Sequence, residues 1–242
     1  MNVRETPRAL ARAVEWEFAQ STYAPVLAEV PPALFLHWAE NAHRAFPGIP
    51  RDASFYAQAT EGLMMFFDCA SAAREACALP SRAADSVWQA WIEMDTAGLE
   101  RFCLRFFGRA IPHCVTGDTD RALAVCLVQA RRRVSQPAAG PHLPRLFSLD
   151  AQLGMPRGAG YRVIGGAVAC SALDEFGSLE DGVHFPPGLT PRALRQAGLV
   201  SEAEYGAAVS PLLPVAQAGW PAAGIEDGGW EGAGDSQAAG RF

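Results

Sequence analysis

The sequence predicts a mostly α fold: a helical bundle-like core, a short irregular or β segment, a C-terminal helical hairpin and a disordered tail. Apolar residues recur at helical spacing through most of residues 7–153, and prolines, glycines and capping residues separate these stretches. The last part of the chain has few aliphatic side chains. With 242 residues, of which 50% are apolar and 19% charged, the chain can bury a core that needs neither disulfides nor metal.

Residues 1–50 are predicted to form a pair of helices packed on the core. Thr6 is a typical N-cap residue, and Pro7 suits the first position of a helix. The apolar face of this first helix consists of Leu10, Val14 and Phe18. A second helix is expected over residues 31–46, because prolines start it and stop it.

Residues 51–164 are predicted to form the main helical core. The stretch 54–79 contains the run 63–67, which is more apolar than one buried face requires, so we expect a central helix buried on most sides. Thr96 is a candidate cap between two further helices. Further helices are expected over residues 81–95, 96–108, 118–134 and 143–153.

Residues 161–170 have the pattern of a small strand or hairpin, and the extension 165–218 is predicted to contain a helical hairpin. Its first helix is expected over residues 190–198, and residues 201–204 form a capping box that starts the second. Residues 219–242 are rich in Gly, Ala and acidic residues, so they are predicted to be disordered.

The absence of lysine excludes several classes of enzyme. All 20 basic residues counted in the chain are arginines. A Schiff base cannot form without a lysine, which excludes pyridoxal phosphate enzymes and imine-forming aldolases. Standard Walker A loops and kinase ATP sites also require a lysine. Common metalloprotease, serine hydrolase, C-x-x-C and EF-hand motifs are missing as well.

Charge and hydropathy further narrow the expected partners and location. A net charge of −6 and a pI near 5.4 argue against a phosphate-binding surface, so nucleic acid is not expected as a partner. The N-terminal residues lack the apolar stretch of a signal peptide, and the apolar runs are too short to span a bilayer. We therefore expect a cytoplasmic protein that does not bind membranes.

Cys103, His113 and Cys114 are candidate zinc ligands, because thiolate and imidazole are the groups that zinc prefers. Cys69 or Cys77 could complete a set of four ligands. The alternative is that Cys103 lies on the apolar face of a helix, while His113 and Cys114 belong to a turn. We favour this alternative because the spacing fits no standard zinc module.

Two other groups of polar residues allow alternative interpretations. His113 could form an acid–base pair with Asp85 or Asp95, although each aspartate also suits a helix cap. The run Arg131–Arg133 could grip a phosphate or an acidic partner. We favour the interpretation that this run is the solvated end of a helix, where positive charge complements the helix dipole.

The segment 79–113 resembles the glycine-rich domain-containing protein-like family, a group of bacterial and plant proteins of unknown biochemical function. The residues that match its pattern are Pro80, Asp85, Trp88, Ile92, Thr96, Phe102, Cys103, Phe107, Gly108, Arg109 and His113. The stretches EGLMMFFDCA and LPRLFSLDAQLGMPRGAGY extend the resemblance to about residues 54–163. The resemblance implies a shared fold.

Two positions depart from the family pattern. Gln89 stands where the family has a histidine after the tryptophan, and Cys114 replaces a second histidine after His113. An amide side chain is a poor zinc ligand and does not transfer protons at neutral pH. The resemblance therefore supports the fold more than it supports an activity.

From the sequence we expect a non-enzymatic protein-interaction or scaffold module with an unknown protein partner and no cofactor. Trp220 and Trp230 are candidate anchors for that partner, because large aromatic side chains dominate binding energy at interfaces. Otherwise they belong to a tail without function. The alternative function is a zinc-type metal-binding protein, structural or hydrolytic, that uses Cys103, His113 and Cys114, with Asp85 nearby.

Overall fold

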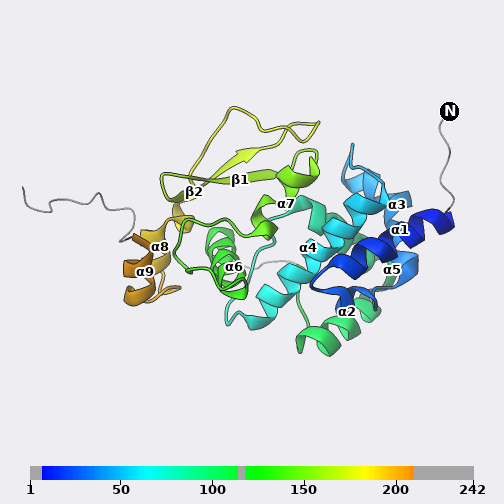
Figure 1. Cartoon of the computed structure of the whole chain (residues 1–242), viewed down its shortest axis with the longest axis horizontal. Helices are drawn as coiled ribbons and strands as arrows, with labels where there is room; N and C mark the ends of the chain where they lie inside the picture. Colours follow the sequence, from blue (N-terminus) through cyan, green and yellow to red (C-terminus); the bar gives the residue numbers. More distant parts are fainter. Residues whose placement is uncertain (1–6, 114–117, 210–242) are drawn as a thin grey trace, which may run out of the picture. The chain divides into compact units, whose positions relative to one another are not determined.

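The computed structural model describes residues 7–113 and 118–209, which belong to one compact unit. Among these residues it confirms a mostly helical fold with a small two-stranded sheet (Figure 1). The helices are α1 (Pro7–Gln20), α2 (Ala24–Leu27), α3 (Pro32–Ala45), α4 (Ala53–Ala72), α5 (Arg82–Phe107), α6 (Thr119–Arg133), α7 (Arg145–Leu153), α8 (Pro191–Gln196) and α9 (Glu202–Val209). The strands are β1 (Ala159–Ile164) and β2 (Ala167–Ala172).

Helix α4 is the central helix of the fold, as the apolar run 63–67 predicts. It packs against α1, α5, α6 and α7 (Figure 1). Most of its side chains are buried. Gly62 lets α7 approach closely, because a Cβ atom at this position would collide with the Leu149 side chain. The helix ends at Ala72, before the expected residue 79, because the chain becomes extended and the Ala78 amide donates to the Ala122 carbonyl of α6.

Helix α5 joins two predicted helices into one kinked helix. Asp95 adopts extended backbone angles (φ −159°, ψ 81°) at the kink. The predicted cap at Thr96 is wrong: the Gly98 amide donates to Asp95 Oδ1 at 2.8 Å, so Asp95 caps the second half of the helix. The Thr96 hydroxyl donates instead to the Ile92 carbonyl at 2.7 Å.

The two predicted N-terminal helices, α1 and α3, pack on α4 and α5. Trp38 of α3 is fully buried, and its indole N–H donates to the Ser86 hydroxyl of α5 at 3.0 Å. The short helix α2 between them was not expected from the sequence. Thr6, the predicted cap of α1, lies outside the described residues.

Asp150 of α7 joins three elements inside the fold. Its carboxylate accepts hydrogen bonds from the Ser81 hydroxyl at 2.7 Å, the Arg82 and Ala83 amides at 2.9 Å each, and the Ala159 amide at 3.0 Å. The first three groups start α5, and the fourth starts β1. Negative charge at a helix N-terminus is favourable, so this buried carboxylate fixes α5 against α7 and the sheet.

The predicted hairpins at the C-terminal side are confirmed in the described residues. β1 and β2 are antiparallel, and Gly165 and Gly166 form their turn with φ values of 56° and 80°. Ser201 and Glu204 exchange the two hydrogen bonds of a capping box at the start of α9.

Arg132 and Arg133 are exposed in the last turn of α6, as predicted for a solvated helix end, but Arg131 is not. Arg131 is 1% exposed and donates to the carbonyls of His142 and Ala138 at 2.9 and 3.0 Å. Burial lowers the pKa of its guanidinium to about 10. Arg132 pairs with Glu204 and Arg133 pairs with Asp68. The correction follows from the loop after α6, which folds back over Arg131.

Among the described residues, none of the helices combines the length and the apolar character that a bilayer crossing needs. The predicted disordered tail, residues 219–242, lies outside this part of the chain.

Candidate functional site

Helix α5 and the segment after it bring together Asp85 and His113. Asp85 and Gln89 lie one helical turn apart, so both side chains point to the same side of α5. His113 Nε2 lies 2.9 Å from Asp85 Oδ1, and the Gln89 amide donates to Asp85 Oδ2 at 2.7 Å. Both oxygens of the carboxylate are thus engaged, one by His113 and the other by Gln89.

Trp88 supports the imidazole of His113 from the core side. The two rings meet edge to face with centroids 4.6 Å apart. Trp88 is 2% exposed and packs on Phe66 and Phe67 of α4, with ring centroids 5.3 and 5.2 Å away. The ring of His113 therefore lies between an aromatic core and a carboxylate, which fixes its orientation.

The Asp85–His113 pair has one of the features of an acid–base site. Because a carboxylate accepts hydrogen bonds, Nε2 of the imidazole must carry the proton, and Nδ1 of the neutral ring remains an acceptor. About a third of each side chain is exposed, at 31% for His113 and 30% for Asp85. Among the described residues, however, Asp85 is the one side chain that hydrogen-bonds to His113.

Asp95, the other predicted partner of His113, is used elsewhere. Its carboxylate caps the second half of α5 and lies 3.8 Å from the guanidinium of Arg101. Of the two aspartates that were candidate partners of His113, Asp85 is therefore the one in contact with it.

The structure places Cys103 in the apolar core, where it is 2% exposed. Burial raises the pKa of its thiol to about 12, and the carboxylate of Glu100 adds to this effect. Within residues 7–113 and 118–209, no three His, Cys, Asp or Glu side chains form a group that could hold a metal ion. Cys114 lies outside this part of the chain, so a zinc site that includes it stays a prediction.

Cys69 and Cys77 belong to a buried thiol cluster instead. The Cys126 thiol of α6 forms hydrogen bonds with both of them, and these contacts, together with burial, raise the pKa of Cys126. The hydrogen bond with Cys126 lowers the pKa of Cys77, and the Arg109 guanidinium acts in the same direction against burial. Sequence spacing gives no indication of this cluster, because its members come from three separate segments.

Most of the other candidate motif residues over 79–113 stabilise α5. Gly108 ends this helix in the left-handed conformation (φ 75°), and Arg109 donates to the Ala73 carbonyl at 3.3 Å. Pro80 precedes the Ser81 cap, whose hydroxyl accepts from the Ala84 amide. Ile92, Phe102 and Phe107 lie in or against the core.

A further surface, which we call the acidic loop, comprises residues 174–185. The loop follows β2 and runs back beside the hairpin (Figure 1). Cys170 and His184 form a β-bridge there. Its exposed large apolar side chains are Phe176, Leu179, Val183 and Phe185, which are 78%, 49%, 41% and 48% exposed. Its acidic residues are Asp174, Glu175, Glu180 and Asp181. The sequence contains no motif that indicates a role for this loop.

The acidic loop has a defined conformation. The Asp174 carboxylate accepts from the amides of Phe176 and Ser178 at 2.8 Å each. Gly177 lies against the backbone of Gly154, so tightly that a Cβ atom there would collide with it. These contacts present Phe176 to solvent on a fixed turn.

No protein-family model, curated protein or solved structure matches this chain. The resemblance to the glycine-rich domain-containing protein-like family therefore stays a prediction. Trp220 and Trp230, the predicted partner anchors, lie outside the described residues.

Proposed function

We propose that the protein is a cytoplasmic, non-enzymatic interaction module that binds a protein partner through the acidic loop. The observation that carries this proposal is the exposure of four large apolar side chains within one short, ordered loop. Exposed apolar groups that gather in this way are typical of protein-binding surfaces. Phe176, at 78% exposed, is the natural anchor because buried aromatic residues supply much of the binding energy at interfaces.

The charge of the acidic loop specifies the chemistry of the partner. Four acidic residues lie in the same loop as the apolar side chains, and His184 is the one basic residue in the loop. A partner segment with an apolar anchor flanked by arginine or lysine residues would complement this surface. Since the turn at Asp174 is already ordered, little conformational entropy is lost on binding.

The arrangement at His113 supports a structural role for this residue. Both oxygens of Asp85 are occupied, and the imidazole packs on Trp88. These contacts attach the segment after α5 to the helix itself. The burial of Cys103 in the apolar core argues against the alternative of a zinc protein that uses this cysteine.

Peptide display tests the proposal. The full chain is used to select from a library of random peptides, and Phe176→Ser and Leu104→Ser serve as comparison targets. Leu104 is a matched control because it is 51% exposed on α5, outside the acidic loop. We expect selected peptides to combine an apolar residue with arginine or lysine, and to lose about tenfold or more in affinity for Phe176→Ser only. Selected peptides without basic residues, or with equal affinity for all three proteins, would refute the proposal.

A further inference from the structure

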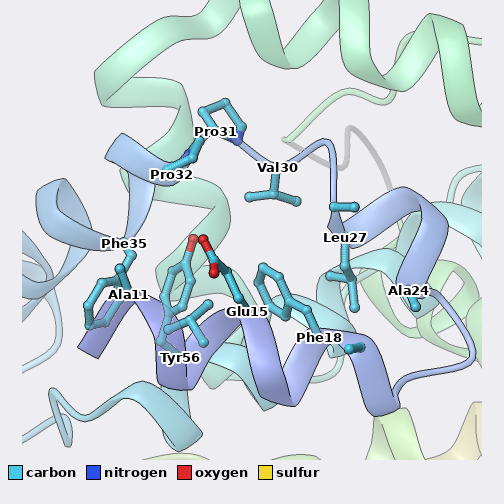
Figure 2. Close-up of a pocket in the computed structure, with 13 residues that line it drawn as sticks. Ala11, Glu15, Phe18, Ala24, Leu27, Val30, Pro31, Pro32, Phe35 and Tyr56 are labelled. Atoms are coloured by element: carbon cyan, nitrogen blue, oxygen red, sulfur yellow. The ribbon is translucent and has the colours of Figure 1, made fainter. Parts of the chain in front are cut away.

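A cavity of about 520 Å³ lies between α1, α2 and the start of α3. This volume is within the range of small-molecule sites. Figure 2 shows apolar side chains around it from all three elements and from α4. The apolar residues that line it most deeply are Val14, Phe18, Leu27, Val30 and Phe35, each at most 9% exposed.

An aromatic wall closes the cavity on the side of α4. Tyr56 is 1% exposed, and its ring lies 5.0 Å from that of Phe35 and 6.3 Å from that of Phe18, between centroids. Trp38 supports Tyr56 from behind at 5.2 Å. This packing holds the wall in one conformation. The faces of aromatic rings attract cations, so the wall favours a positively charged ligand.

Two polar residues line this apolar space: Tyr56 is buried, whereas Glu15 is exposed and lies where the cavity meets solvent. Figure 2 shows the Glu15 carboxylate of α1 and the Tyr56 hydroxyl directed toward one another in the cavity. Glu15 is the one acidic residue among the residues that line the cavity, and none of them is basic. Burial raises the pKa of Tyr56, so its hydroxyl stays protonated at neutral pH.

We propose that this cavity binds a small amphipathic cation, a primary ammonium group carried by an aromatic or branched apolar body. The ammonium group would pair with the Glu15 carboxylate and donate to the Tyr56 oxygen, while the apolar body contacts Phe18, Val30 and Phe35. A carboxylate or phosphate ligand would meet Glu15 with no compensating cation. This site is distinct from the acidic loop and uses different residues.

Three small probes that differ in their head group test the proposal. The probes are 4-phenylbutylammonium, 4-phenylbutanol and 4-phenylbutyrate, titrated into the full chain at pH 7 by isothermal calorimetry or ligand-observed NMR. We expect the ammonium probe to bind with a dissociation constant on the order of 1 mM or below. Its affinity should be about fivefold or more above that of the alcohol, and the carboxylate probe should bind most weakly.

Variants on α1 assign the effect to the cavity. Glu15→Gln should lower the affinity for the ammonium probe to that for the alcohol and leave the alcohol unaffected. Glu17→Gln, on the same helix but outside this cavity, should change neither affinity. Ala11→Trp should fill the cavity and abolish binding of both probes, and circular dichroism checks that this variant folds.

Three results would overturn the proposal. The first is equal affinity for all three probes, and the second is no detectable binding of the ammonium probe. The third is much tighter binding after deletion of residues 2–6, because the chain's own N-terminal residues would then be the occupant. None of these outcomes depends on the binding of peptides by the acidic loop.

Discussion

At the scale of single residues, Asp150 has the largest structural role that the sequence does not reveal. It is 1% exposed and accepts four hydrogen bonds from Ser81, Arg82, Ala83 and Ala159. Its partners at the start of α5 lie about seventy positions earlier in the chain. Helical periodicity predicts the helix that carries Asp150 but not a contact at this sequence separation.

Asp150→Ala should lower the free energy of unfolding by about 3 kcal/mol or more, because it leaves several buried donors without an acceptor. Chemical denaturation measures this change. The matched control is Asp118→Ala, which removes an exposed carboxylate that caps α6 and should cost about 1 kcal/mol. Equal losses in the two variants would contradict the account of Asp150.

The cysteines should differ strongly in reactivity. We expect Cys77 to be more reactive than Cys103. The hydrogen bond with Cys126 and the nearby Arg109 lower the pKa of Cys77, whereas burial raises the pKa of Cys103 to about 12. With iodoacetamide at pH 8, we expect Cys77 to be alkylated about tenfold or more faster than Cys103 in the folded protein. Mass spectrometry of the resulting peptides measures the alkylation rate of each cysteine separately. The substitution Arg109→Gln should slow the alkylation of Cys77 and leave that of Cys103 unchanged. Faster alkylation of Cys103 would show that these pKa directions are wrong.

At the scale of elements, the sequence predicts the helices well but misses one short helix and one capping residue. The helical spacing of apolar residues located α3, α4 and α6 because burial of one face dictates that period. The break at Asp95 was located, because one helix was predicted to end at residue 95 and the next to begin at 96. Its cap was assigned to Thr96 and not to Asp95, because both residue types are good N-caps. The short helix α2 was missed because four residues are too few to show a period.

Trp88 tests the packing between α4 and α5 on which the Asp85–His113 pair depends. Trp88→Ala should lower the free energy of unfolding by about 3 to 5 kcal/mol, because the ring fills the core between Phe66 and Phe67. Trp16→Ala is the control, since Trp16 is 64% exposed on α1, and it should change stability by about 0.5 kcal/mol or less. Chemical denaturation of both variants measures these changes. A Trp88→Ala protein as stable as the wild type would show that this ring does not stabilise the core.

At the scale of the whole molecule, the two candidate binding surfaces were harder to predict than the fold. The Asp85–His113 contact could be proposed from the sequence because both residues stand in one motif, although Asp95 remained an equal choice until the distance was known. The cavity beside Tyr56 and the acidic loop were not predicted. Both depend on which apolar side chains stay uncovered after the helices pack. The helical spacing of apolar residues in the sequence does not give that information.

The central claim is that the acidic loop binds a basic partner through local charge and an apolar anchor. The most direct test is the dissociation constant of the tightest selected peptide for the wild-type chain and for the variant Glu175→Gln, Glu180→Gln, Asp181→Asn. The control neutralises three exposed acids elsewhere, Glu40→Gln, Glu93→Gln and Glu100→Gln, with the same change in net charge. We predict about a fivefold or greater loss of affinity in the loop variant and no loss in the control at physiological salt. Unchanged affinity in the loop variant, or an equal loss in both, would contradict the claim.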